Sequence, residues 1–448
     1  MFNDILKFIS HISFLILVSN TIQFSQIVDS TNSPSLYPFV VDSIRIIGNE
    51  STKDFIILRE LTFGIGDTIT EKNSYYNRER VYSLGIFNHV YFTPAIIDGK
   101  NILNIDVEES WYIYPIPFID AKEGDLKKLS YGMYLTLKNF RGRNEEFSVA
   151  FALGYDPSLF FNYYNPNISG KKNIFVRAKL GYADISNRSP AAEKLYGESF
   201  YQKNYFLQFI IGKRFGLFHR LFLSTSYRYI ETPIYVPKIN ASSNRIDNLF
   251  DLGFGYEYDS RDLIQFPKNG IYTNLNYTFK GLGIDNINYS VASFDFREYR
   301  NFIGSLITKW RIASRFTFGA NIPYYDYSIL GLDNKIRGHS SEKFEGNNYY
   351  FLSLELCYPI IEEMNIDLTF IPIISDRLLS YRIGFYTQVF IESGAALLKG
   401  KPLTFSDFKS GYGAGITLLI LPYNVLRIDF ALDEYKNLET LLNLGISF

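Results

Sequence analysis

The chain has 448 residues and a net charge of −1, from 45 basic and 46 acidic side chains. This balance excludes the basic footprint of a nucleic-acid surface, and the length exceeds one ordinary soluble core unless the chain forms a large barrel. Aromatic residues make up 17% of the chain, which suits aromatic girdles at a lipid–water boundary. The single cysteine, Cys357, excludes a disulfide framework and a cysteine-rich metal cluster.

The N-terminal segment has the pattern of a secretory signal. Lys7 precedes an apolar stretch centred on Phe14–Val18, which is too short to cross a bilayer as a helix. We predict a signal peptide over residues 1–25, with the cleavage site left open, and a linker over residues 26–39. The alternative is a buried N-terminal helix. No other run of ~18 apolar residues occurs, so no transmembrane helix is predicted.

Residues 40–110 are predicted to form an α+β domain of order β-α-α-β-β. Turn signals at Gly48-Asn49 and Asp98-Gly99 separate its elements, and Gly85 ends the second helix as a C-terminal glycine. The expected elements are a strand at Phe39–Ile47, helices at about Thr52–Leu61 and Glu71–Leu84, and strands around Val90–Phe92 and Leu103–Val107.

Residues 111–448 are dominated by alternation of apolar and polar side chains, the period of a β-strand. Between Phe250 and Tyr258 the even positions are large and apolar, and the odd positions are Asp, Gly or Glu. A soluble sandwich would point the apolar face at a core, whereas a membrane barrel points it at lipid. A barrel of 16 antiparallel strands is predicted, with Leu159–Tyr164 and Asn365–Pro372 as its weakest members. Its last strand ends on the aromatic Phe448, as an outer-membrane sorting signal does.

A long segment without strand alternation, Asn321–Asn348, interrupts the barrel pattern and contains Arg337-Gly338-His339. Loops of this length are commonly functional. In the neighbouring strands alternate residues face the same side, and this alternation places Glu355 and Glu392 on the lumen side. A guanidinium can satisfy such carboxylates through paired hydrogen bonds, so we predict that Arg337 latches the loop inside the barrel.

These motifs resemble those of the outer-membrane protein assembly-factor superfamily, which includes BamA, TamA and the two-partner secretion exporters. Residues 40–110 resemble a single POTRA domain, with I-x-x-G-N early and L-G-I-F-x-x-V late. His339 stands where the family has an aromatic residue, which could give the latch some pH sensitivity. The motif residues are Arg337 and Gly338; Phe390, Glu392 and Gly394; Asp259, Arg261, Asp262, Pro267 and Gly270 of a Y-D-x-R-D…P-x-x-G hairpin; and Asn139 and Gly142 of an N-x-x-G element.

The resemblance implies insertion or translocation of outer-membrane proteins, without a cofactor. The POTRA domain, in the periplasm, would take up unfolded clients by β-augmentation. The barrel, in the bacterial outer membrane, would insert them where its first and last strands meet. The implied partners are those clients, the lipid bilayer and accessory lipoproteins or periplasmic factors. The alternatives are a two-partner exporter of a passenger protein and a plain diffusion porin.

Enzymatic motifs are missing from the sequence. There is no G-x-S-x-G motif, and none of the four histidines is spaced as a metal pair. Gly411, Gly413 and Gly415 occupy alternate inward strand positions, where they make room in the lumen. The chain is therefore predicted not to be an enzyme, with no metal site.

Overall fold

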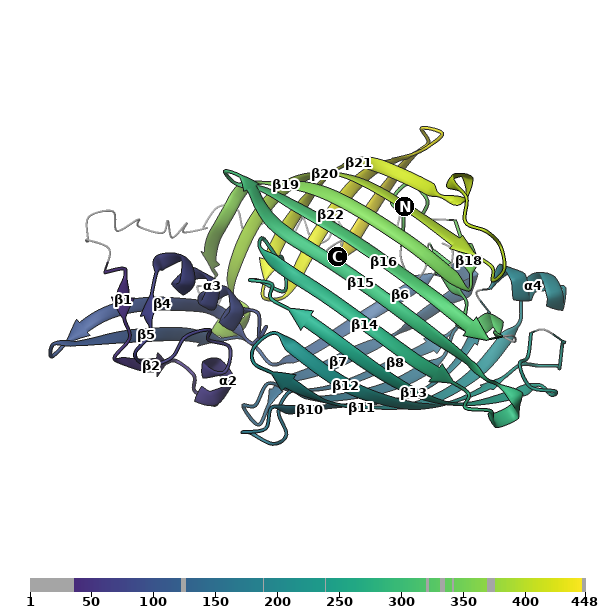
Figure 1. Cartoon of the computed structure of the whole chain (residues 1–448), viewed down its shortest axis with the longest axis horizontal. Coiled ribbons are helices and arrows are strands. Elements are labelled where there is room, and N and C mark those ends of the chain that lie inside the picture. Colours follow the sequence, from purple (N-terminus) through teal and green to yellow (C-terminus); the bar gives the residue numbers. More distant parts are fainter. Residues whose placement is uncertain are drawn as a thin grey trace.

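The computed structural model describes residues 36–121, 126–187, 189–237, 239–319, 322–330, 335–340, 342–368 and 375–444. A small α/β unit lies at one end of a large antiparallel sheet that curls into a barrel (Figure 1). The predicted signal peptide and Phe448 lie outside the described residues. Within the ranges given, no helix is long and apolar enough to cross a membrane.

The α/β unit has the predicted order, with two additional short strands. β5 pairs in parallel with β2 and antiparallel with β4, and the two helices pack on this sheet. Ile56, Val81 and Ile105 lie in its buried core. The elements are β1 (Phe39–Val40), β2 (Ser43–Ile47), α2 (Asp54–Leu58), β3 (Thr68–Ile69), α3 (Glu71–Tyr82), β4 (Phe87–Ile97) and β5 (Lys100–Glu109).

The first helix is shorter than the predicted Thr52–Leu61. The carboxylate of Glu109 accepts hydrogen bonds from the Thr52 backbone N–H at 2.7 Å and from its hydroxyl at 2.7 Å. These bonds hold Thr52 outside the helix, which begins at Asp54. A contact from a distant strand thus overrides the local helix signal.

The large sheet contains sixteen antiparallel strands, which confirms the predicted fold class. Each strand pairs with its neighbour along the chain, and the two ends of the sheet are β6 and β23. The strands are β6 (Ile113–Ala121), β7 (Leu129–Phe140), β8 (Glu145–Gly154), β9 (Ser158–Asn165), β10 (Ile174–Ser186), β11 (Tyr201–Phe215), β12 (His219–Glu231), β13 (Ile246–Asp259), β14 (Gly270–Lys280), β15 (Tyr289–Ile303), β16 (Leu306–Gly319), β19 (Asn348–Asp367), β20 (Ser380–Leu397), β21 (Lys409–Leu421), β22 (Asn424–Asp433) and β23 (Leu438–Leu444).

The membership of the sheet differs from the prediction at two strands. Asn365–Pro372 is not a separate strand, because Asn365–Asp367 form the end of β19, and residues 369–374 lie outside the described part. Register shifts between Pro359 and Met364 break the alternation of β19 and make its sequence read as two segments. The sheet reaches sixteen strands through β6 instead, whose Pro115 and Pro117 are unfavourable within a strand and keep it from standing out in the sequence.

The faces of the sheet follow the alternation of the sequence. Phe250 and Phe254 of β13 are exposed on the outside, whereas Asp251 is buried on the inside. The Asp251 carboxylate accepts hydrogen bonds from Lys280 at 3.1 Å and from Arg228 at 3.4 Å. The wall therefore has an apolar outer face and a charged lining.

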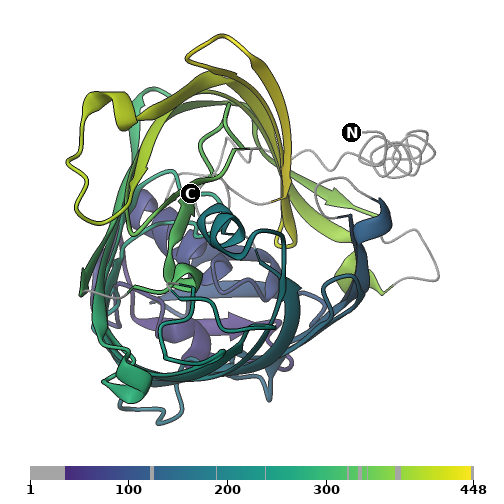
Figure 2. The ribbon, with the colours of Figure 1, turned by 90° about the vertical axis from the view of Figure 1, so that its right-hand side faces the viewer.

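The two mouths of the barrel are occupied differently. The α/β unit lies at one mouth, and the helix α4 (Pro190–Tyr196) and the short strand β18 (Phe344–Gly346) lie at the other (Figure 1). Figure 2 looks into the barrel from the α4 end, and the α/β unit is seen behind the lumen. Short 3-10 turns complete the loops: η2 (Leu126–Lys128), η3 (Ile284–Asn286), η4 (Tyr324–Asp326), η5 (Asp376–Leu378) and η6 (Phe405–Asp407).

Candidate functional site

The long segment between β16 and β19 folds back into the lumen. Within it β17 (Ser328–Leu330) pairs with β18, so the segment contains a small sheet that its sequence pattern did not predict. Ile336 packs with Leu330 and with Phe351 of the barrel wall in a buried apolar cluster. This packing delivers the next residue, Arg337, to the inner surface. We call residues 335–340 the latch.

Arg337 contacts three carboxylates of the wall. Its Nη1 lies 3.1 Å from Glu355 Oε2 and 3.5 Å from Asp429 Oδ2, and its Nη2 donates to Glu392 Oε1 at 2.6 Å. The Arg337 backbone N–H donates to Glu392 Oε2 at 2.9 Å, and the guanidinium lies 3.4 Å from the centre of the Phe390 ring. The structure thus brings Arg337, Glu355 and Glu392 together.

The cations and anions of this cluster balance. Arg427 donates to both Glu355 and Asp429, and Lys309 Nζ lies 3.9 Å from Glu355 Oε1. Three positive side chains therefore face three carboxylates, and all six are almost fully buried. Removing one partner from such a cluster leaves an uncompensated buried charge and costs about 3–5 kcal/mol. The members of this latch cluster are Lys309, Arg337, Glu355, Glu392, Arg427 and Asp429.

Glycines of β21 admit the backbone of the latch. A Cβ on Gly411 would lie 1.6 Å from the Arg337 carbonyl oxygen, so no larger residue fits there without movement. Gly338 has φ +99°, a left-handed conformation that favours glycine, and a Cβ there would meet Leu432 O at 3.0 Å. The close approach of two backbones explains glycine at both positions.

The outer end of the latch binds β23 and the turn that precedes it. The Gly338 N–H donates to Glu439 Oε2 at 2.9 Å. His339 Nε2 lies 2.5 Å from Glu434 Oε2, and His339 Nδ1 lies 2.9 Å from Glu342 Oε1. Burial alone would lower the pKa of His339, but the hydrogen bonds with Glu342 and Glu434 outweigh it and raise the pKa above its ordinary value.

The hairpin motif lies at the opposite mouth, away from the latch. Arg261 donates to both Asp259 oxygens at 2.9 and 2.8 Å. The Asp262 carboxylate accepts the backbone N–H of Lys268 at 3.0 Å, which closes the turn around Pro267. Gly270 has φ +116°, and a Cβ there would meet Ser260 O at 2.4 Å. These motif residues shape a turn that faces the α/β unit.

Among the ion pairs that join that unit to the barrel are two buried sets that sequence reasoning missed. Glu79 of α3 accepts a hydrogen bond from Arg382 of β20 at 2.8 Å, and Glu60 accepts two from Arg214 of β11 at 2.6 and 2.8 Å. Ser83 Oγ donates to the Asp262 carbonyl oxygen at 3.1 Å. The sequence shows charged residues in and beside the two helices of the unit but gives no indication of their partners.

Over the described ranges, no group of three or more His, Cys, Asp or Glu is arranged to hold a metal ion. The functional features are instead a sixteen-stranded wall with an apolar exterior, a loop held in a charged lumen, and a small α/β unit covering one mouth. Together they define a β-barrel protein of an outer membrane.

Comparison with known proteins gives the family. A model described as "Omp85 superfamily domain" matches residues 139–448, and a POTRA model, "Surface antigen variable number repeat", matches residues 39–110. The first match covers more than half of the chain, so the chain belongs to the Omp85 superfamily. The predicted family resemblance and outer-membrane location are confirmed, and the α/β unit is a POTRA domain.

Individual relatives are similar in part. Over 70 residues the chain is 37% identical to the outer membrane protein assembly factor BamA of Neorickettsia risticii, a match over 15% of this chain and 10% of that protein. The structure of Haemophilus ducreyi BamA lacking POTRA domains 1–3 has a TM-score of 0.53 at 16% identity, covering 95% of this chain and 89% of that one. CdiB from Escherichia coli has a TM-score of 0.51 at 10% identity, covering 91% and 75%. The structural likenesses show a shared fold.

Proposed function

We propose that the protein inserts other β-barrel proteins into the outer membrane, by pairing a client strand with the edge of its own sheet. The observation that carries this proposal is the seam between β6 and β23. Over the described residues no backbone pairing joins these two strands. Backbone groups in lipid must find hydrogen-bond partners, so an edge at the seam is a template for an incoming strand.

The sequence of β6 weakens closure of the seam. The β6–β7 ladder is continuous from Ile113 to Ala121, so Pro115 and Pro117 must turn their missing donors away from β7. Both prolines therefore remove a hydrogen-bond donor from the free edge. β23 cannot form a full ladder with such an edge, which favours a seam that opens.

The contents of the barrel bear on how the seam is held. The latch occupies the lumen, and the POTRA domain covers the periplasmic mouth. The latch also ties the loop to strands near the C-terminal end of the sheet, since Asp429 belongs to β22 and Gly338 binds Glu439 of β23. Arg337, Gly338, Glu355 and Glu392 accordingly hold the C-terminal side of the seam in place.

The domain boundaries accompany this proposal. Residues 40–110 act as the periplasmic domain that takes up unfolded clients by β-augmentation, and residues 111–448 act as the barrel. Residues 1–25 direct export, residues 26–39 link that segment to the periplasmic domain, and Phe448 marks the chain for its own assembly. Accessory lipoproteins or periplasmic factors are the further partners, and no enzymatic step is involved.

Depletion of the protein tests the proposal. The outer membrane is inventoried by quantitative proteomics before and after depletion, with inner-membrane proteins as the internal control. Broad loss of other barrels is expected. Loss of a single secreted protein would support export instead, and unchanged content of both would contradict either activity.

A further inference from the structure

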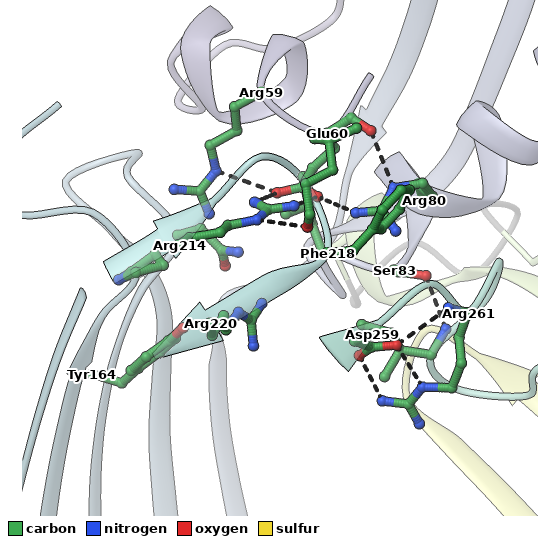
Figure 3. Close-up of a pocket in the computed structure, with 15 residues that line it drawn as sticks. Arg59, Glu60, Arg80, Ser83, Tyr164, Arg214, Phe218, Arg220, Asp259 and Arg261 are labelled. Atoms are coloured by element: carbon green, nitrogen blue, oxygen red, sulfur yellow. Dashed lines mark hydrogen bonds and ion pairs between the residues drawn. The ribbon is translucent and has the colours of Figure 1, made fainter. Parts of the chain in front are cut away.

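A cavity of about 150 Å³ lies between the POTRA domain and the periplasmic mouth of the barrel. Figure 3 shows side chains from the segment just after α2, from α3 and from the barrel strands β9, β11, β12 and β13 around it. Its lining is unusually rich in arginine, and the five come from both parts of the chain: Arg59, Arg80, Arg214, Arg220 and Arg261.

The carboxylates near the cavity do not balance these arginines. Glu60 and Asp259 are the two carboxylates in its lining. A third, Glu257, accepts a hydrogen bond from Arg220 at 2.8 Å. Five guanidiniums therefore face three carboxylates, which leaves two positive charges in excess. Partly buried like charges repel one another, so this excess favours the binding of an anion.

Two of the arginines have hydrogen-bonding capacity to spare. Glu60 is taken up by Arg214 and Arg80, which donate to it at 2.6 to 2.9 Å. Arg59 Nε is buried without a hydrogen bond to the described residues, and its nearest carboxylate oxygen, Glu60 Oε1, is 3.3 Å away. Arg220 donates to Glu257 through Nη1 alone, as far as the described residues go.

The surroundings of Arg59 disfavour its positive charge. Burial lowers the pKa of the Arg59 guanidinium, Glu60 opposes this, and the positive charges of Arg214 and Arg220 lower the pKa further. A bound anion would reverse this balance. Tyr164 and Ser83 line the same cavity and add hydroxyl donors.

We propose that this cavity binds a small oxyanion of the phosphate type, held mainly by Arg59 and Arg220. Arginine forks match the oxygens of phosphate, and each contact is a charge-assisted hydrogen bond. The volume equals that of about five water molecules in the liquid, which admits a single phosphate group. It is well below the ~300 Å³ at which pockets for larger ligands begin, so the phosphate group is the part of a ligand that would enter it. The anion is either free inorganic phosphate or the phosphate of a phospholipid headgroup.

The test uses the full chain in detergent micelles free of phospholipid. Isothermal titration with inorganic phosphate forms one arm, and native mass spectrometry after addition of phosphatidylglycerol forms the other. Arg59→Gln and Arg220→Gln should each weaken binding about tenfold, the effect of losing one charge-assisted hydrogen bond. Arg59→Lys keeps the charge and should lose less. Arg300→Gln removes an equal charge from an exposed arginine that does not line the cavity, and should change nothing.

The two arms separate the sources of the anion. Phosphate binding that is lost in the Arg59 and Arg220 variants assigns the site to the free ion. If only phosphatidylglycerol is retained, and the same variants lose it, the site is assigned to a lipid headgroup. Either result supports the site. Binding of neither probe, or an equal loss in Arg300→Gln, overturns it. Each variant is first checked for the resistance of its folded barrel to SDS, so that misfolding is not taken for loss of the site.

Discussion

The latch cluster in the lumen and the arginine cavity at the POTRA junction are both built from buried guanidiniums and carboxylates, but they differ in charge balance. In the latch cluster three cations face three anions, and Arg337 contacts several of them at once. At the junction, Glu60 alone faces three arginines. A balanced cluster holds one arrangement firmly, whereas a cluster with excess charge depends on what else binds there. We therefore expect the loop to stay fixed in the lumen, whereas the arrangement at the junction should change with what binds there.

The largest expected effect is that of Glu60→Gln, because it leaves Arg59, Arg80 and Arg214 without their shared carboxylate. Docking of the POTRA domain should weaken by about 4 kcal/mol. Hydrogen exchange of the periplasmic turn at residues 260–269, which contacts the POTRA domain, measures this loss. Glu50→Gln is the matched control, because Glu50 forms an exposed pair with Arg377 at the same junction and should cost under ~1 kcal/mol. Equal effects of the two variants would contradict the role of Glu60.

The lowered pKa of Glu60 also leads us to expect that docking of the POTRA domain weakens at acid pH. Burial would raise the pKa of Glu60, but the hydrogen bonds and charge of Arg214, with Arg59 and Arg80, lower it from 4.5 to about 2. Its contribution is therefore complete above pH 4.5 and is lost as the pH falls toward 2. Hydrogen exchange followed from pH 5 to pH 3 should show faster opening of the junction in the wild type. Glu60→Gln should show a weaker dependence.

Arg337→Ala is expected to have the next largest effect. It should weaken docking of the latch by about 3 kcal/mol, because it leaves one negative charge uncompensated in the lumen. Activity should fall while the barrel still reaches the outer membrane. Protease cleavage within residues 335–340 of intact cells measures release of the loop. Arg337→Lys keeps the charge without the planar fork and should be intermediate. Full activity of Arg337→Ala would count against the latch.

Gly411→Ala tests the same latch without altering charge. Its methyl group would lie 1.6 Å from the Arg337 carbonyl oxygen, so the loop must shift at a cost of about 2 kcal/mol. Gly64→Ala adds the same methyl where the nearest atom is 3.9 Å away. Protease sensitivity of the latch should rise in the first variant alone. A rise in both would mean that the contact at Gly411 is not specific.

The smallest effect is expected from His339, at the outer end of the latch. Its pKa is raised, so its stabilisation is complete below pH 6.5 and is lost as the pH rises through the raised value. Glu342 and Glu434 are its partners, and Lys409 competes for Glu434 at 3.1 Å. Because both glutamates are partly exposed, the change should stay under ~1 kcal/mol. Protease sensitivity measured from pH 6 to 8 should rise with pH, and His339→Phe should abolish that dependence.

The fold can be predicted from the sequence wherever apolar and polar residues alternate regularly. Alternation along Phe250–Tyr258 identifies a strand and both of its faces, and the parity of Glu355 and Glu392 turns them toward Arg337. Prediction from the sequence fails where this alternation is broken, at the prolines of β6 and at the register shifts of β19. It also fails for pairs such as Glu60 and Arg214, which meet only because the POTRA domain docks on the barrel. No local pattern encodes that docking.

Site-specific photocrosslinking at the seam tests the central claim most directly. A photoreactive residue placed at Ile116 of β6 is compared with one at Phe254 of β13, two outward side chains exposed by 53% and 49%. During synthesis of an outer-membrane barrel client, the account predicts crosslinks from position 116 and few from position 254. Equal crosslinking at both positions, or none at 116, would contradict insertion at the β6 edge.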